Sequence, residues 1–244
     1  MNLINFRDLG NTPTTTGRKI KPKRLLRSAD LNEITDNCAN RLIQEYNLKK
    51  ILDLRTPGEA DLRPNRPVEN ALYLNIDVLE GLNHEPMSSF SSLNEKRAKA
   101  HMKKFYEKFL YTHTGLAKFF REVLNNQEGS VLFHCAHGKD RTGFGAALIL
   151  KALEVDDNEI YSDYLKTVKA REAENQLVAQ KYRERGFSEE EIAGIKSLFT
   201  VEKDYLIHIF TLIEEKFGNF ENYFTENLGI TENEIIELRI NYLD

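Results

Sequence analysis

The chain has 244 residues, 41% of them hydrophobic, which suits one sizeable α/β domain with its own core. Its net charge of −4 lacks the basic surplus of general nucleic-acid binders, and no apolar run approaches the roughly 20 residues of a membrane-spanning helix. We therefore expect a single domain over residues 1–244, with no nucleic-acid partner and no stable membrane insertion.

The first half of the chain alternates short apolar segments with helical patterns. The hydroxyl of Thr35 can accept a hydrogen bond from a first helical turn, so a helix is expected to begin there. Pro and Gly residues at 56–58 and 64–67 indicate breaks. In chain order we expect a strand at 23–27, a helix at 35–46, strands at 50–54 and 71–76, an irregular stretch at 81–93, and helices at 95–111 and 115–125.

In the second half, a strand at 131–134 and a helix at 142–153 flank a short loop. Three glutamates after Ser188 favour the N-terminus of another helix. Helices are expected at 158–185, from 188 onward, and at 201–217, 220–227 and 231–243. The pattern predicts one central sheet with helices packed on one side of it, and a helical C-terminal third.

The loop at 134–143 reads His-Cys-Ala-His-Gly-Lys-Asp-Arg-Thr-Gly, with Cys135 at its start and Arg141 six positions later. A loop of this length can wrap around a tetrahedral dianion, because its N–H groups and the following helix N-terminus point at the anion. Cysteines in such a field have pKa values of roughly 3.5–7.5 and react as thiolates. Arg141 supplies a planar fork for two phosphoryl oxygens. We expect hydrolysis of phosphate esters through a phosphocysteine.

Other interpretations of this loop fit less well. A buried structural cysteine would not need three charged residues in series before Thr142, and the nucleotide-binding pattern G-x-x-x-x-G-K-[ST] is absent. Zinc is disfavoured because the neighbours His134 and Cys135 would point to opposite sides of an extended backbone, so neither metal nor cofactor is expected. A rhodanese-like sulfur transferase and an inactive phosphate-binding module stay open, although Cys135 and Arg141 together weigh against both.

The loop carries the C-x5-R pattern and closely resembles the cysteine-based protein tyrosine phosphatase superfamily. With four further segments, the chain resembles the bacterial and fungal tyrosine and lipid phosphatases. This resemblance implies a tyrosine phosphatase-like α/β fold without a cofactor. It implies phosphotyrosine proteins as substrates, with dual specificity and phosphoinositides as further options. The four segments are Asn-Phe-Arg-Asp-Leu-Gly at 5–10, Leu-Arg-Ser-Ala-Asp-Leu at 26–31, Ile-Leu-Asp-Leu-Arg-Thr at 51–56 with Glu59, and 205–228.

The resemblance also suggests the catalytic roles. Cys135 is the expected nucleophile, and Arg141 is expected to bind the phosphoryl group and stabilise transition-state charge. A carboxylic acid normally protonates the leaving group, and the resemblance favours Asp140. Asp77, at the end of a predicted strand, is the alternative acid. Asp140 could instead form an ion pair with Lys139 or Arg141.

The other loop residues each allow two interpretations. Thr142 could donate a hydrogen bond to the departing thiolate or cap the helix. Lys139 could hold a second phosphate, as in lipid phosphatases, or simply add positive charge. His137 could face substrate or solvent. The expected substrate-binding residues are Ala136, His137, Gly138, Lys139 and Thr142.

Supporting residues are expected outside the loop. His134 precedes the nucleophile and should orient the loop, while Asp53 and Arg55 stand at the carboxyl end of a strand, where open α/β sheets place their sites. Asp77 is included for the same reason. Arg7, Asp8, Arg27 and Asp30 are expected to form ion pairs around the loop or to be solvated. Residues 81–104 could cover the pocket, with a solvated helix face as the default.

The chain has two cysteines, too few for a disulfide framework, and Cys135 must stay reduced to act. Cys38 is expected to be a packing residue, with a resolving thiol as the alternative. No secretory pattern is visible at the N-terminus. A reducing, cytoplasmic location is therefore expected, with secretion left open.

Overall fold

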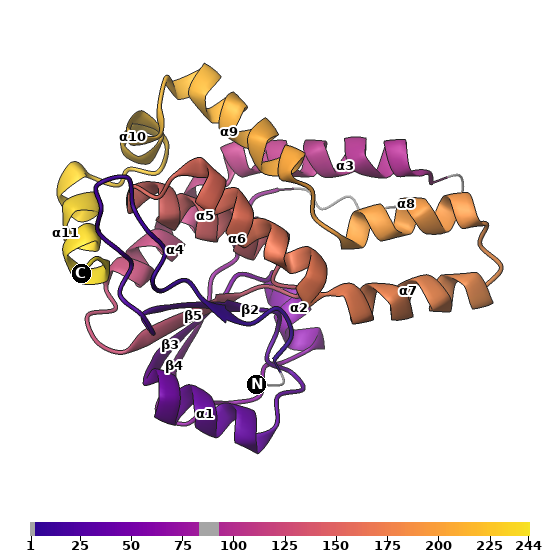
Figure 1. Ribbon diagram of the computed structural model, residues 1–244, viewed down its shortest axis with the longest axis horizontal. Coiled ribbons are helices and arrows are strands. Elements are labelled where there is room, and N and C mark those ends of the chain that lie inside the picture. Colours follow the sequence, from indigo (N-terminus) through magenta and orange to yellow (C-terminus); the bar gives the residue numbers. More distant parts are fainter. Residues whose placement is uncertain (1–2, 83–92) are drawn as a thin grey trace.

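The computed structural model describes residues 3–82 and 93–244, and a five-stranded sheet of order β1-β2-β5-β3-β4 forms its centre (Figure 1). The β1–β2 pair is antiparallel, and the remaining pairs are parallel. This order places β5 between two parallel neighbours, so the loop after it emerges at the carboxyl edge of the sheet. The strands are β1 (Arg7–Asp8), β2 (Leu25–Ser28), β3 (Leu48–Asp53), β4 (Leu72–Asn75) and β5 (Ser130–His134).

Several helices begin at side-chain caps that the sequence encodes. Thr35 caps the first long helix, and capping boxes begin three others at Thr56, Ser188 and Thr231. The helices are α1 (Asp36–Tyr46), α2 (Pro57–Leu62), α3 (Glu95–Glu107), η1 (Lys108–Tyr111), α4 (His113–Leu124), α5 (Asp140–Ala152), α6 (Asp157–Ala170), α7 (Glu172–Glu184), α8 (Glu189–Phe199), α9 (Lys203–Phe217), α10 (Phe220–Asn222), η2 (Tyr223–Asn227) and α11 (Glu232–Tyr242).

Helices cover both faces of the sheet, so the prediction of helices on one side only was wrong. Side chains alternate between the two faces along each strand. Leu26 and Leu132 belong to a small core with α1, whereas Leu25 and Phe133 belong to the main core with the later helices. Figure 1 shows α1 on one side of the sheet and α5 and α6 on the other. Strand β5 is buried at every position, as expected when both faces are covered. The predicted central sheet, flanking helices and helical C-terminal third are confirmed.

The predicted long helix at 158–185 is two helices that meet at Arg171, whose φ and ψ are −115° and 10°. No Gly or Pro at this point signalled the break. The predicted helix at 95–111 ends in a short 3-10 segment, η1. Helices α7 and α8 run side by side away from the sheet, with α3 packed against α8 (Figure 1).

The predicted irregular stretch at 81–93 and the predicted cover at 81–104 include residues 83–92, which lie outside the described residues. Within the described ranges, none of the helices has the length and apolar character needed to cross a membrane. Cys38 packs in the small core with α1, on the face of the sheet opposite the cluster that contains Cys135. This location matches a packing residue.

Candidate active site

The catalytic loop, residues 135–139, joins β5 to α5 and depends on one left-handed backbone position. Gly138 has φ +64°, and a Cβ there would lie 2.2 Å from the Ser28 carbonyl oxygen. Only glycine satisfies both constraints. The Gly138 carbonyl oxygen accepts hydrogen bonds from Asn5 Nδ2 at 2.7 Å and from Arg27 Nη2 at 3.1 Å. The loop is therefore held from outside by residues of the N-terminal segment and β2.

Arg141 lies in the first turn of α5 and is clamped by Glu59 of α2. Its Nη1 and Nη2 atoms lie 2.5 and 2.7 Å from the two carboxylate oxygens. Burial opposes ionisation, but the hydrogen bond to Glu59 and the charge of Cys135 raise the pKa of Arg141 above its ordinary value. Burial likewise opposes ionisation of Glu59, yet Arg141 and Thr56 lower its pKa to about 2. The guanidinium thus has a fixed direction before substrate arrives.

Glu59 had no assigned role in the sequence prediction. The signal that could have found it is the spacing of Thr56 and Glu59 as a capping box. That motif holds the carboxylate in place: the Thr56 N–H donates to Glu59 Oε2 at 2.9 Å. The cap of α2 therefore also positions the partner of Arg141.

Replacing Glu59 with Gln should lower kcat about 10- to 100-fold. Arg141 would lose its carboxylate partner, and its guanidinium would then adopt a wider range of orientations. Steady-state kinetics with an aryl phosphate and a thermal melt would be measured together. Thr56→Ala is the matched control, since it weakens the same cap by about 1 kcal/mol without removing the carboxylate. If Thr56→Ala lowers kcat as much as Glu59→Gln, helix stability and not Arg141 positioning explains the loss.

Cys135 lies buried at the base of the loop, 3% exposed. The guanidiniums of Arg27, Arg141 and Arg171 lie within electrostatic reach of its sulfur. The hydroxyl of Thr142 is buried and has no hydrogen-bond partner among the described residues. Helix α5 begins at Asp140, with Lys139 at the N-cap position, so the alternative that Thr142 caps this helix was wrong. The hydroxyl of Thr142 is therefore available to donate a hydrogen bond to an acceptor outside the helix backbone.

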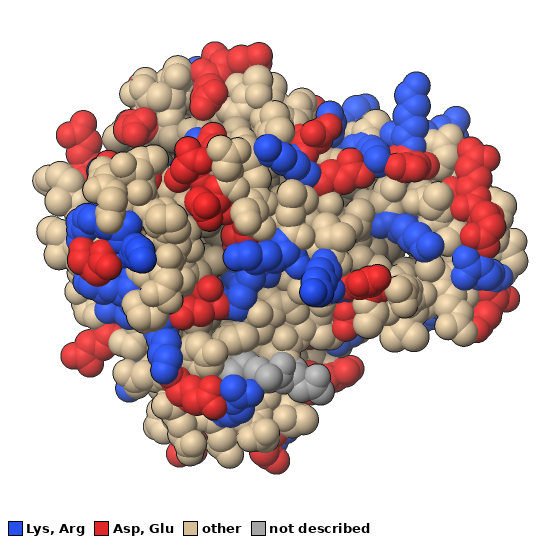
Figure 2. Space-filling view, viewed as in Figure 1, with Lys and Arg blue, Asp and Glu red and all other residues tan. Residues whose placement is uncertain are grey.

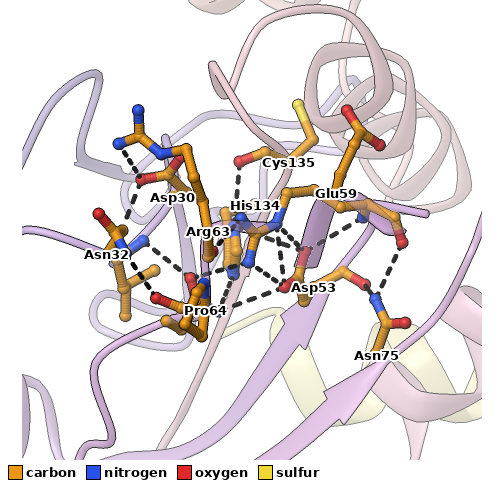
Figure 3. A network of polar contacts seen from close by, with 12 residues as sticks. Asp30, Asn32, Asp53, Glu59, Arg63, Pro64, Asn75, His134 and Cys135 are labelled. Carbon is orange, nitrogen blue, oxygen red and sulfur yellow. Dashed lines mark hydrogen bonds and ion pairs between the residues drawn. The ribbon is translucent and has the colours of Figure 1, made fainter. Parts of the chain in front are cut away.

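His134 links the loop to a buried network behind it (Figure 3). Asn65 Nδ2 lies 2.8 Å from His134 Nε2, while His134 Nδ1 lies 3.0 Å from the Cys135 carbonyl oxygen. Because the amide nitrogen of Asn65 can only donate, Nε2 accepts and Nδ1 carries the proton. Burial lowers the pKa of His134, which keeps the ring neutral in this arrangement. The predicted orienting contact is present, and Asn65 is a partner that sequence reasoning missed.

Asp53 and Arg55 form a buried ion pair in the same network, with Asp53 Oδ2 and Arg55 Nη2 2.6 Å apart. Both side chains are 1% exposed or less. Burial would raise the pKa of Asp53, but the hydrogen bond and charge of Arg55, with the Tyr73 hydroxyl, outweigh it and lower that pKa. Asp53 Oδ2 also accepts a hydrogen bond from the Tyr73 hydroxyl at 2.8 Å. The structure therefore brings both predicted supporting residues behind the loop.

Two arginines near the loop share one carboxylate, Asp163 of α6. Arg7 Nε and Arg27 Nη1 lie 2.6 and 2.7 Å from its two oxygens. Burial and the charge of Arg7 lower the pKa of Arg27 to about 10, with Asp163 opposing them. Since Arg27 also bonds to Gly138, this pair ties α6 to the loop. Asp163 was not predicted, because one acid in a charged helix looks like solvated surface.

The other two charges expected beside the loop have local roles. Asp8 accepts hydrogen bonds from the Gly10 and Lys23 N–H groups at 2.8 and 2.7 Å. Asp30 lies 3.5 Å from the exposed guanidinium of Arg63. Asp8 therefore supports a turn, whereas Asp30 forms the kind of ion pair that was expected.

Asp140 lies in the first turn of α5, in contact with two groups. Its carboxylate oxygens lie 3.1 and 2.9 Å from Lys139 Nζ, and the Tyr106 hydroxyl donates to Oδ1 at 3.1 Å. The Tyr164 hydroxyl lies 2.5 Å from that of Tyr106. Asp77, the alternative acid, accepts a hydrogen bond from the Leu79 N–H at 2.8 Å and supports the turn after β4. The structure thus places Asp140 at the loop and gives Asp77 a local structural contact.

The side chains of Lys139 and His137 are less exposed to solvent than the sequence suggested. Lys139 is 4% exposed and also donates to the Thr200 carbonyl oxygen at 3.3 Å. The His137 ring contacts Phe199, with centroids 5.8 Å apart. Burial, Arg171 and Lys139 lower the pKa of His137 to about 3, so it is neutral near pH 7. The C-terminal end of α8 therefore closes one side of the loop.

Comparison of sequences gives matches over the whole chain. A model described as "Tyrosine phosphatase family" matches residues 1–244. A candidate tyrosine-protein phosphatase of Cupriavidus necator is 29% identical over 244 residues, covering 99% of this chain and 86% of that protein. The triple specificity protein phosphatase PtpB of Mycobacterium tuberculosis is 26% identical over 273 residues, covering 96% and 95%.

Solved structures give weaker matches. The core catalytic domain of the PP-IP phosphatase SIW14 from S. cerevisiae has a TM-score of 0.38 and 20% identity, covering 68% of this chain and 77% of that one. PTPMT1 in complex with PI(5)P has a TM-score of 0.30 and 14% identity, covering 78% and 94%. At these scores the structural comparisons add nothing to the match in sequence.

Proposed function

The chain belongs to the tyrosine phosphatase family, and we propose from this premise that it is a cysteine-dependent protein-tyrosine phosphatase that forms a phosphocysteine. The observation that carries the proposal is the catalytic loop. Its nucleophile, Cys135, lies within the electrostatic reach of Arg141, and Glu59 holds that guanidinium in one direction. A fixed cation beside the sulfur nucleophile is what phosphoryl transfer requires.

In the proposed reaction, the Cys135 sulfur forms a bond to phosphorus while the ester P–O bond breaks. Asp140 gives its proton to the leaving oxygen. A water molecule then attacks phosphorus and returns a proton to Asp140, and the S–P bond breaks. Inorganic phosphate and the thiolate are the products. Arg141 and the loop N–H groups bind the phosphoryl oxygens throughout.

Phosphotyrosine proteins are the proposed substrates and partners, and phosphoinositides are the second candidate. A second phosphate would need a free cation, and the resemblance to lipid phosphatases suggests Lys139 for this role. Its ammonium is instead engaged by Asp140 and the Thr200 carbonyl oxygen. On the face shown in Figure 2, basic and acidic side chains are intermixed, whereas anionic lipid surfaces attract clustered basic residues. Both observations favour the protein substrate.

The test is a substrate panel with the wild-type protein in the presence of a chelator. It would contain a phosphotyrosine peptide, a phosphoserine peptide, short-chain phosphatidylinositol phosphates and, for sulfur transfer, thiosulfate. We expect kcat/KM to be about tenfold or more higher for the phosphotyrosine peptide than for any other substrate. A higher value for the phosphoinositides would reverse the ranking. Loss of all hydrolysis on chelation would contradict the metal-independent mechanism.

A further inference from the structure

A buried tyrosine cluster lies behind Asp140, and the reaction described above assigns it no role. It consists of three side chains from three helices, each 1% exposed or less: Tyr106 of α3, Tyr164 of α6 and Tyr205 of α9. The ring centroids of Tyr106 and Tyr205 lie 5.6 Å apart. The packing of these helices around the start of α5 therefore brings phenol hydroxyls from distant parts of the chain to the catalytic loop.

The hydrogen bonds of this cluster run in one direction, toward Asp140. The Tyr106 hydroxyl donates to Asp140 Oδ1 at 3.1 Å, and the Tyr164 hydroxyl lies 2.5 Å from that of Tyr106. Burial raises the pKa of both tyrosines well above the ordinary value, so both hydroxyls keep their protons. A phenol has a single proton to donate. Since Tyr106 gives its proton to the bond with Asp140, Tyr164 is the donor to Tyr106.

This direction determines which oxygen of Asp140 can carry the proton for the leaving group. Oδ1 accepts the hydrogen bond from Tyr106, so the acidic proton belongs on Oδ2. The other contact, with Lys139, lies 2.9 Å from Oδ2, and its charge attracts the side chain only while the carboxylate is ionised. The Tyr106 hydroxyl can donate to Oδ1 in both protonation states. It can therefore hold the carboxyl group before and after the proton is transferred.

We propose that Tyr106, supported by Tyr164, is a positioning residue that keeps Oδ2 of Asp140 directed at the leaving oxygen. The Asp140 side chain is 17% exposed, whereas the two tyrosines contact it from the buried side and do not touch the substrate. A general acid must come within about 2.6–3.2 Å of the atom that it protonates, so a loosely held carboxyl loses rate. This inference rests on the proposed function, in which Asp140 is the acid.

The experiment makes one change, Tyr→Phe, at each position of the cluster, which removes a hydroxyl and leaves the ring. It measures kcat/KM for a phosphotyrosine peptide and for an aryl phosphate with a strongly acidic phenol. In Tyr106→Phe we expect the ratio of the first value to the second to fall about tenfold. In Tyr164→Phe it should fall about two- to threefold, because Tyr106 keeps its bond to Asp140.

The matched control is Tyr205→Phe in the same cluster. Its hydroxyl is buried and has no hydrogen-bond partner among the described residues, so the ratio should stay at the wild-type value. If Tyr106→Phe lowers both kcat/KM values by the same factor, the tyrosine contributes only packing and the inference is overturned. The same conclusion follows if Tyr106→Phe and Tyr205→Phe give equal ratios.

Asp140→Asn, measured with the same two substrates, separates this inference from the proposed function. If that variant lowers the ratio but Tyr106→Phe does not, Asp140 acts without help from Tyr106, so the inference fails and the proposed function stands. If neither variant lowers the ratio, Asp140 is not the acid and the inference fails with that assignment. If the wild-type protein hydrolyses neither substrate, the proposed function fails as well.

Discussion

Replacing Cys135 with serine is expected to reduce kcat for a phosphotyrosine peptide by 10⁴-fold or more, on the order of the loss seen when other enzymes lose their nucleophile. The Cys135 sulfur lies within electrostatic reach of three guanidiniums near the N-terminus of α5, and sulfur is intrinsically a much stronger nucleophile than a hydroxyl oxygen. A serine hydroxyl has a far higher pKa and stays protonated in the same field. Steady-state hydrolysis with chelator present is the measurement.

The matched control for this substitution is Cys38→Ser, at the other cysteine of the chain. Cys38 lies in α1, is 2% exposed and packs in the small core across the sheet from the loop. Its replacement should lower the melting temperature slightly and leave kcat unchanged. Acid quenching of the wild-type reaction should trap a phosphoryl group on Cys135. Full activity in Cys135→Ser would show that the thiol is not the nucleophile.

Asp140→Asn should reduce kcat for the phosphotyrosine peptide about 10²- to 10⁴-fold, the usual contribution of a general acid. Asparagine keeps the size of the side chain and can accept the Tyr106 hydrogen bond, but it has no proton to give to the leaving oxygen. An aryl phosphate with a strongly acidic phenol needs little protonation. The variant should therefore lose much less activity with that substrate.

Asp77→Asn is the paired variant, because Asp77 is the other carboxylic acid that the sequence offered for this role. Its side chain accepts the Leu79 N–H, so its replacement should affect the turn after β4 and leave the leaving-group dependence unchanged. The opposite pattern, with leaving-group dependence appearing in Asp77→Asn and not in Asp140→Asn, would transfer the role of acid to Asp77.

The catalytic loop could be predicted from the sequence because its parts are contiguous. Cys135, Gly138 and Arg141 lie within seven positions, and the apolar run before them and the helix after them are local patterns. Most element boundaries also follow from local signals such as the caps at Thr35 and Ser188. Strand β1 was missed because two residues are too short for any periodicity to appear.

The partners of the loop could not be predicted, because they lie far away along the chain. Glu59 is 82 positions from Arg141, and Asp163 is 136 positions from Arg27. A single acid in a helix has the same local sequence signal whether it is solvated or buried against a guanidinium. Only the packing of α2 and α6 against the loop distinguishes these cases.

By itself, the sequence determined the order of the secondary structure elements and the chemistry of one loop. In that loop a thiol, a glycine and a guanidinium lie within a few residues of one another along the chain. The tertiary structure decided which carboxylates neutralise the arginines and that both faces of the sheet are covered. The physical reason is that burial and charge pairing depend on distances in space, which the order of the strands and the break between α6 and α7 establish.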